Sequence, residues 1–189
     1  MKRITTILLA LAMVLSLVAC GSSQSGSEST GETPLQILET VWDSYTDSEK
    51  FPVMGGGPEF DQSVMDVPGA FATTDGEAID SLLGFPDSSL ALIDDAASIM
   101  HAMNQNTFTA GAYHVSNPGD VEMLISDLED NILNRQWMCG FPDTLIIVKV
   151  DTNTLVSAFG EATNIENFKA RITEAYAGAE VVSEQSLVQ

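Results

Sequence analysis

Basic residues are scarce in this sequence. Its 189 residues include 27 aspartates and glutamates but only 7 lysines and arginines, so the formal net charge is −20. A protein that binds nucleic acid needs clustered lysine and arginine to displace the counterions of the phosphates. The composition therefore excludes nucleic acid as a partner, and it disfavours direct docking on anionic lipid headgroups.

Cysteine and histidine are equally rare, with two of each. A lipid on Cys20 would leave Cys139 without an intramolecular disulfide partner. Because Cys139 lies among Trp137, Met138 and Phe141, we interpret it as a buried hydrophobic side chain, with a reactive thiol as the alternative. The C-x-x-C, H-E-x-x-H and G-x-S-x-G patterns do not occur, so these redox, zinc-protease and serine-hydrolase motifs are absent.

The sequence does contain a strongly marked N-terminus. Lys2 and Arg3 precede an apolar run over residues 7–19 that only Ser16 interrupts. A basic start, an apolar run and then small residues predict a secretory signal peptide over residues 1–19. The run is shorter than the ~20 residues that a membrane-spanning helix needs.

The predicted signal ends in Leu17-Val18-Ala19-Cys20, which resembles the lipobox of bacterial lipoproteins. The resemblance implies that Cys20 receives a diacylglyceryl thioether and becomes the new N-terminus. Two acyl chains anchor a protein stably, whereas one gives marginal binding. We therefore predict a lipoprotein on the extracytoplasmic side of the cell membrane, with Cys20 as its lipid anchor. A secreted protein in which Cys20 lies near the cleavage site by chance is the alternative.

Composition also divides the mature chain. Residues 20–33 are rich in glycine and serine and predict a flexible tether that follows the lipidated cysteine. Residues 34–104 predict an N-terminal helical segment with a Gly/Pro-rich loop, and residues 105–185 predict an α+β core. We expect residues 34–185 to form one domain, because this length suits a single core.

Three helices are expected in the N-terminal segment on local signals. Thr33, Pro34 and Gln36 form a capping box that starts a helix ending near Ser48. The second is a short helix through Leu83 that a capping-box pattern at Thr74–Glu77 opens. After the break at residues 84–86, a longer helix is predicted from residue 87 or 88 to about Met103.

The glycine-rich run Gly55–Gly57 follows the first of these predicted helices. The run is compatible with a loop that surrounds a ligand. It is also compatible with a segment that crosses the surface and is held by Phe51 and Met54, and we favour this second interpretation.

The pattern from residue 107 onward predicts alternating strands and helices. The unbroken apolar run Leu145–Val148 indicates a central strand buried on both faces. Residues 154–160 favour a strand, with a helix as the alternative. The resulting order is that of a ferredoxin-like βαββαβ sandwich, an antiparallel sheet with helices on one face, preceded by the N-terminal helices. Its elements are strands at 107–115, 144–151, 154–159 and 180–183, and helices at 117–134 and 163–178.

Residues 51–176 also resemble a loosely defined family. The resemblance rests on four segments in order. They are Phe-Pro-Val-Met at 51–54, Leu-Leu-Gly-Phe at 82–85, the segment from Met100 to Tyr113 that leads into a strand, and Asn-Pro-Gly-Asp at 117–120. The family comprises small lipoproteins of Gram-positive anaerobes that carry a domain of unknown function, some labelled bacteriocin transport accessory proteins. The resemblance implies a lipoprotein with no established activity.

Two groups of residues suggest metal ligands. Met100, His101 and Met103 offer the thioether and imidazole ligands that suit copper, but core packing is the favoured interpretation. Asp151 and Asn153 resemble the start of a calcium loop, although the later glycine and glutamate of an EF-hand are missing. We therefore predict no metal and no cofactor.

No catalytic constellation emerges from the remaining residues. His114 falls on one face of a predicted strand, where a lone histidine is more often packed than catalytic. The sequence predicts a non-enzymatic binding or accessory module of the cell envelope, anchored through Cys20, whose partner is an envelope or secreted protein. A small hydrolase that uses Cys139 or carboxylates, and a metal-binding lipoprotein, are the alternatives.

Overall fold

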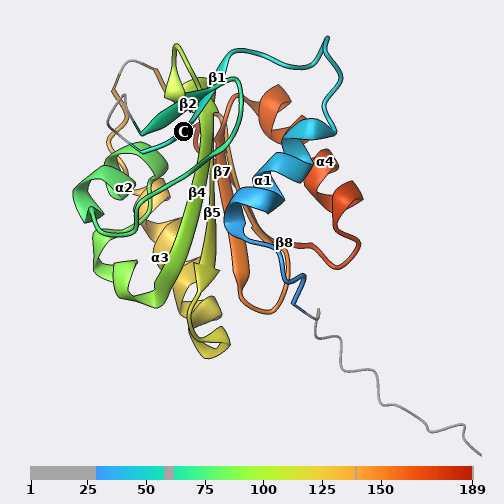
Figure 1. Cartoon of the computed structure of the whole chain (residues 1–189). Helices are drawn as coiled ribbons and strands as arrows, with labels where there is room; N and C mark the ends of the chain where they lie inside the picture. The colour runs from blue at the N-terminus through green and yellow to red at the C-terminus, as the bar shows by residue number, and fades with distance from the viewer. Residues whose placement is uncertain (1–28, 58–61, 139, 189) are drawn as a thin grey trace, which may run out of the picture.

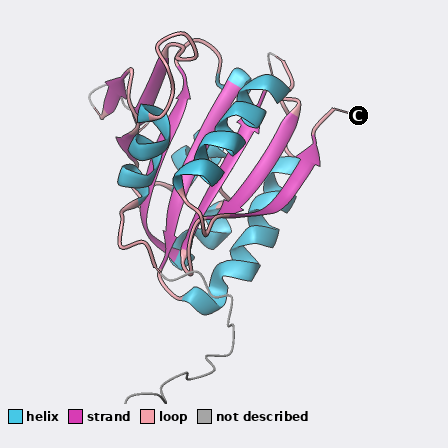
Figure 2. Cartoon of the chain, turned by 90° about the vertical axis from the view of Figure 1, so that its right-hand side faces the viewer, coloured by secondary structure: helices cyan, strands magenta, loops and turns pink. Residues whose placement is uncertain are grey.

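The structure, a computed structural model, describes residues 29–57, 62–138 and 140–188. One antiparallel sheet of eight strands runs through these ranges, with helices on both of its faces (Figure 1, Figure 2). Its strand order is β2-β1-β4-β5-β7-β6-β8, and β3 pairs with β4 beside this path. The predicted mixture of helices with an antiparallel sheet is confirmed.

The elements have the following bounds. The strands are β1 (Val53–Gly56), β2 (Ser63–Met65), β3 (Gly69–Ala70), β4 (Ile93–His101), β5 (Phe108–Val115), β6 (Thr144–Lys149), β7 (Thr154–Gly160) and β8 (Glu180–Ser186). The helices are α1 (Pro34–Asp43), α2 (Gly76–Leu83), α3 (Val121–Leu133) and α4 (Ala162–Ala175). Short 3-10 turns are η1 (Asp87–Leu92), η2 (Gln105–Thr107) and η3 (Pro118–Asp120).

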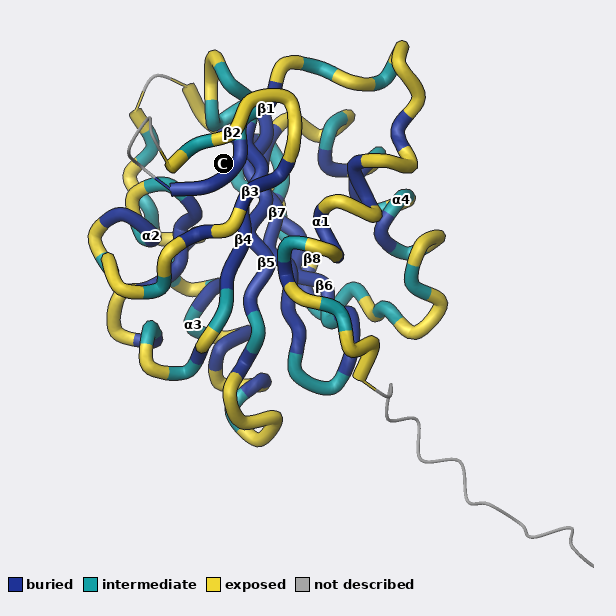
Figure 3. Tube along the Cα trace, in the orientation of Figure 1, coloured by how far each residue is buried: buried dark blue, intermediate teal, exposed yellow. Residues whose placement is uncertain are grey.

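Two hydrophobic cores lie on the two faces of the sheet, so the central strands are dark blue in Figure 3. Helices α1 and α4 cover one face, and α2 and α3 cover the other. Because neighbouring side chains of a strand point to opposite faces, Ile146 belongs to the first core while Leu145 and Ile147 belong to the second. The predicted burial of this strand on both faces is confirmed.

The helix starts follow the local signals. The side-chain oxygen of Thr33 accepts a hydrogen bond from the backbone N–H of Gln36, and the Gln36 side chain accepts one from the backbone N–H of Thr33. This is the predicted capping box, and Pro34 is the first residue of α1. The helix packs through Ile37 and Leu38, which are fully buried.

The expectation of helices on one face is wrong, although the element order β5-α3-β6-β7-α4-β8 matches the predicted βαββαβ order. A ferredoxin-like sheet would place β8 beside β5. Here β4 occupies that edge of β5, and β8 pairs with β6 instead. The β5-α3-β6 and β7-α4-β8 connections each pass over one strand in the same direction along the sheet. Because their starting strands, β5 and β7, are antiparallel, right-handed connections place α3 and α4 on opposite faces.

The helix predicted from residue 87 or 88 to Met103 is also wrong, because η1 and then β4 occupy this segment. Strand β4 lies inside the sheet between β1 and β5, so residues from Ala96 to Met100 are buried towards both faces. A strand that is buried on both faces is apolar at nearly every position, so periodicity alone cannot distinguish its sequence from that of a buried helix. The helical alternative for residues 154–160 is wrong as well, since they form the fully buried strand β7.

The Gly55–Gly57 run begins inside strand β1 and lies where two backbones cross. A Cβ atom on Gly55 would lie 2.2 Å from the backbone nitrogen of Gly69 and 2.4 Å from the carbonyl carbon of Pro68. Beneath this crossing, the buried hydroxyl of Ser98 accepts a hydrogen bond from the Gly56 N–H and donates one to the Gly56 carbonyl. Backbone packing therefore accounts for Gly55.

Candidate functional site

One end of the sheet holds the beginning of the described chain. The Thr30 backbone N–H and hydroxyl both donate to Oδ2 of Asp151, at 2.8 and 2.9 Å. Asp151 lies in the turn between β6 and β7, beside which the blue start of the chain lies in Figure 1. The last part of the predicted tether is therefore fixed to the domain. Residues 20–28 of that tether lie outside the described ranges.

The carboxylate of Asp151 is buried, with 1% of the residue exposed. Its second oxygen, Oδ1, accepts the backbone N–H of Asn153 at 3.0 Å. Burial alone would raise the pKa of Asp151, but hydrogen bonds from Thr30, Asn153 and Thr154 outweigh it, and the net pKa lies below the ordinary value. The protein's own donors occupy both oxygens, so the calcium reading of Asp151 and Asn153 gains no support from the geometry.

His114 of β5 lies next to this junction. Its Nδ1 is 2.5 Å from Oδ1 of Asp94, and its Nε2 is 2.6 Å from the side-chain nitrogen of Asn153. A carboxylate that holds one imidazole nitrogen is the orienting half of a catalytic triad. The other nitrogen, however, faces an amide rather than a hydroxyl or thiol nucleophile. The cluster therefore ties β4, β5 and the β6–β7 turn together.

His101 has a structural environment at the opposite end of the sheet. Its Nδ1 accepts hydrogen bonds from the backbone N–H groups of Met103 and Asn104, at 3.1 and 3.2 Å. Its ring stacks on Phe51 with 5.5 Å between centroids. Met100 is buried in the core under α2 and α3, whereas Met103 is 85% exposed. The three proposed copper ligands therefore do not converge.

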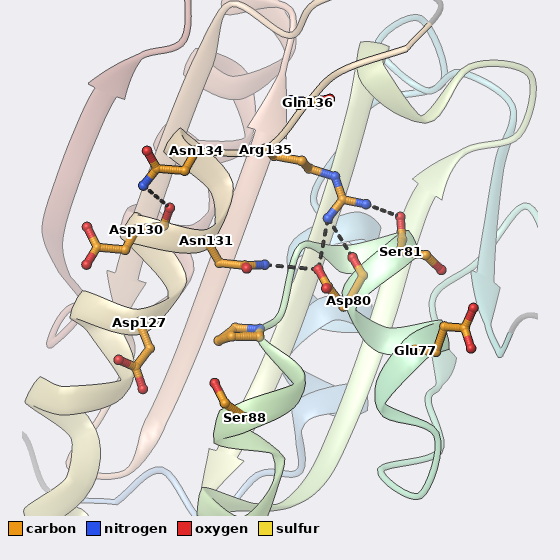
Figure 4. A pocket seen from close by; sticks show the side chains of 11 residues that line it. Glu77, Asp80, Ser81, Ser88, Asp127, Asp130, Asn131, Asn134, Arg135 and Gln136 are labelled. Carbon is orange, nitrogen blue, oxygen red and sulfur yellow. Dashed lines mark hydrogen bonds and ion pairs between the residues drawn. The ribbon is translucent and has the colours of Figure 1, made fainter.

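A surface hollow of about 700 Å³ lies between α2 and α3 (Figure 4). Four carboxylates line it together with neutral polar side chains and one arginine; the carboxylates are those of Glu77, Asp80, Asp127 and Asp130. Some of these are already engaged, since Asp127 accepts a hydrogen bond from the Ser89 hydroxyl at 2.6 Å. The hollow is an acidic depression without a nucleophile and base in contact.

Arg135 is the cation of this hollow, and Figure 4 shows it reaching from the end of α3 to α2. It donates to the backbone carbonyls of Asp80 and Ser81 at 2.7 and 2.5 Å, and to the Asp80 carboxylate at 3.1 Å. Asn131 adds bonds to the Asp80 carboxylate and the Gly84 carbonyl. The Ser81 and Gly84 carbonyls lie at the C-terminus of α2, where a helix end leaves acceptors unpaired, whereas the Asp80 carbonyl also accepts the Gly84 N–H. Arg135 is thus a helix cap.

Large apolar side chains are exposed at the end of the sheet opposite Asp151. Met103 follows β4, and Met138 and Phe141 precede β6; their exposed fractions are 85%, 80% and 70%. The strand register places both loops at the same end of the sheet. Met100 pairs with Thr109, the neighbouring Phe108 pairs with Gly160, and Gly160 also pairs with Thr144. We call these three side chains, Met103, Met138 and Phe141, the distal tip.

Both cysteines of the sequence hypotheses, Cys20 and Cys139, lie outside the described residues. Within residues 29–57, 62–138 and 140–188, no group of three or more histidine, cysteine or acidic side chains is arranged to hold a metal ion. In the same ranges, no helix combines the length and apolar character that crossing a membrane requires.

Comparisons with protein-family models, curated proteins and solved structures gave no match for this chain. The functional argument therefore rests on the chain's own residues and their arrangement.

Proposed function

We propose that this chain is a membrane-anchored extracytoplasmic lipoprotein that acts as a non-enzymatic binding or accessory module. The N-terminal pattern ending in Cys20 motivates the anchor. The family of small lipoproteins that the sequence resembles is compatible with this role.

The observation that carries the proposal is the difference between the two ends of the domain along its strands. The chain enters at the Thr30–Asp151 junction, at one end of the sheet. The exposed apolar residues of the distal tip lie at the other end. Strands of this length span roughly 20 Å at about 3.3 Å per residue. A domain tethered at one end and apolar at the other is suited to contacting a partner away from its anchor.

Membrane fractionation tests the anchor. The Cys20→Ala variant is expected to move from the membrane fraction to the soluble fraction, because it loses both acyl chains. Cys139→Ala is the matched control and should stay with the membrane. Cys20→Ala protein that still sediments with membranes would overturn the anchor.

Crosslinking in living cells tests the accessory role. A C-terminally tagged protein is crosslinked, solubilised and compared with the Cys20→Ala variant. A stoichiometric envelope protein that is captured by the parent and lost from the variant is expected. A parent sample with no crosslinked protein contradicts an accessory role.

A further inference from the structure

The distal tip is held together by a specific pair of hydrogen bonds. The side-chain amide nitrogen of Asn106 donates to the backbone carbonyls of Met138 and Gly140, at 3.0 and 2.9 Å. Asn106 belongs to the turn that follows Met103, so the bonds fasten one loop to the other. The exposed methionines therefore lie on two loops that are fixed to each other.

The aromatic side chain beside the distal tip is packed against the domain, whereas the side chains of the tip itself are exposed. Trp137 contacts the ring of Phe159 with 5.0 Å between centroids, so it belongs to the sheet core. Met138 and Phe141, on either side of the same bend, remain 80% and 70% exposed. Single exposed apolar residues need no explanation, but several gathered together mark an interaction surface.

The charge around the tip is negative. Asp143 lies two residues beyond Phe141 in the sequence, and Glu161 follows Gly160, whose carbonyl accepts the Asp143 N–H. On the other side, the acidic hollow between α2 and α3 extends to Gln136, two residues before Met138. Among the described residues, two cations lie in this part of the domain. Arg135 is engaged by Asp80, and Lys50, which adjoins the Phe51 that stacks on His101, lies over the Trp42 ring at 5.4 Å. An occupant of the tip would thus meet apolar contacts flanked by carboxylates.

The negative charge around the distal tip favours one class of binding partner over the others. A second copy of the chain would bring its own acidic surface against the first, and the net charge of −20 opposes that association. An anionic membrane is repelled for the same reason. A basic segment gains from both features, because its cations are steered by the carboxylates while its apolar residues cover the tip.

We propose that the distal tip, Met103, Met138 and Phe141, is the docking surface for a basic, apolar-bearing segment of a partner protein. The proposal rests on the accessory function above and names the chemistry of the partner. The tip residues provide contact area, and the carboxylates on either side select for positive charge.

A pair of synthetic helical peptides tests the proposal on the full-length protein in zwitterionic lipid nanodiscs, with empty discs as the blank. One peptide has lysine and leucine at helical spacing, and its counterpart has glutamate in place of lysine. The lysine peptide is expected to bind and to weaken with added salt, and the glutamate peptide is not. Equal binding of the two peptides would overturn the proposal.

Substitutions locate the binding. Combined Met103→Ser, Met138→Ser and Phe141→Ser changes are expected to weaken binding of the lysine peptide at least about tenfold. Met123→Ser is the matched control, because Met123 is a half-exposed methionine on α3 outside the tip. A triple variant that binds as tightly as the parent would disprove the tip as the docking surface.

A measurement on the unsubstituted protein guards against misfolding of the triple variant. A nitroxide on the lysine peptide should broaden the methyl signals of Met103 and Met138 and leave that of Met123 sharp. Broadening of Met123 alone would refute the assignment. The fractionation result separates the two failures: if Cys20→Ala protein leaves the membrane but the lysine peptide does not bind the parent, the docking surface alone is refuted.

Discussion

Thr30 and Asp151, which lie 121 positions apart in the sequence, are joined by two hydrogen bonds to a single carboxylate oxygen. The bonds fix where the N-terminal segment leaves the folded domain. Asp151 is buried at a turn, so its carboxylate is an anchor point set by the sheet rather than by a mobile surface loop.

Removal of this anchor should destabilise the protein. Asp151→Ala deletes hydrogen bonds to a charged acceptor, and we expect the free energy of unfolding to fall by roughly 1.5–3 kcal/mol. Thr30→Val keeps the backbone bond, so a loss of about 1 kcal/mol is expected. Urea denaturation measures both, with Ser29→Ala as the exposed neighbouring control. An unchanged midpoint for Asp151→Ala would show that the bonds contribute nothing net.

Acid should weaken the fold through two carboxylates. Hydrogen bonds from Thr46 and then from Arg171 lower the pKa of Glu49 from 4.5 to about 2, and the pKa of Asp151 is lowered from 3.8. A lowered pKa in the folded state means that the unfolded chain binds protons more readily. The stabilisation is therefore present near neutral pH and is lost as pH falls from 4.5 towards 2.

The Glu49→Gln variant checks this acid dependence. Its urea midpoint at neutral pH should be lower than that of the parent, and the two should converge in acid. Glu122→Gln, at an exposed position on α3, is the control and should follow the parent curve. Parallel curves for the parent and Glu49→Gln at every pH would contradict the linkage.

The backbone crossing at Gly55 should be intolerant of any side chain. In Gly55→Ala, the new Cβ meets backbone atoms of Pro68 and Gly69 that cannot rotate away, so a loss of about 1–3 kcal/mol is expected. Gly119→Ala is the control, because its nearest contact, at 3.4 Å, is the side chain of Asn117. Thermal melts compare the two. A stable Gly55→Ala protein would mean that β1 and β3 separate readily.

Arg135 should control the order of the end of α2. Arg135→Lys retains the charge but cannot form the same fork of bonds to the Asp80 and Ser81 carbonyls. We expect faster hydrogen exchange of the amides near Leu83, with β7 unaffected. Gln136→Ala, which also lines the hollow, is the control. Unchanged exchange at α2 would remove the capping role from Arg135.

Local sequence signals predicted the elements that local interactions stabilise. The capping box at Thr33 and the turn at Asn117 start helical structure where expected, and the run Leu145–Val148 forms a buried strand. The segment that becomes β4 was mistaken for a helix, because burial on both faces removes the alternation that identifies a strand. That error also concealed the strand order, since β4 takes the edge of β5 that β8 was expected to occupy.

The candidate sites depend on contacts that no spacing in the sequence reveals. Asp151 was noticed for its resemblance to a calcium loop, and its partner Thr30 lies within the segment predicted to be flexible. The sequence predicts Met103 at the end of a helix and favours core packing for it, and Met138 draws attention only as a neighbour of Cys139. Only the strand register brings the loops of Met103 and Met138 to the same end of the sheet.

The strand order also implies a sequence of folding events. Strands β4 and β5 form one antiparallel pair from nearby segments, and β6 and β7 form another. The β5–β7 pairing, such as Phe108 with Gly160, joins these two hairpins and closes a long stretch of intervening chain. Closing such a loop costs entropy before its contacts form, so long-range pairing slows folding. The two hairpins are thus expected to assemble early, and their joining through β5 and β7 is expected to limit the rate.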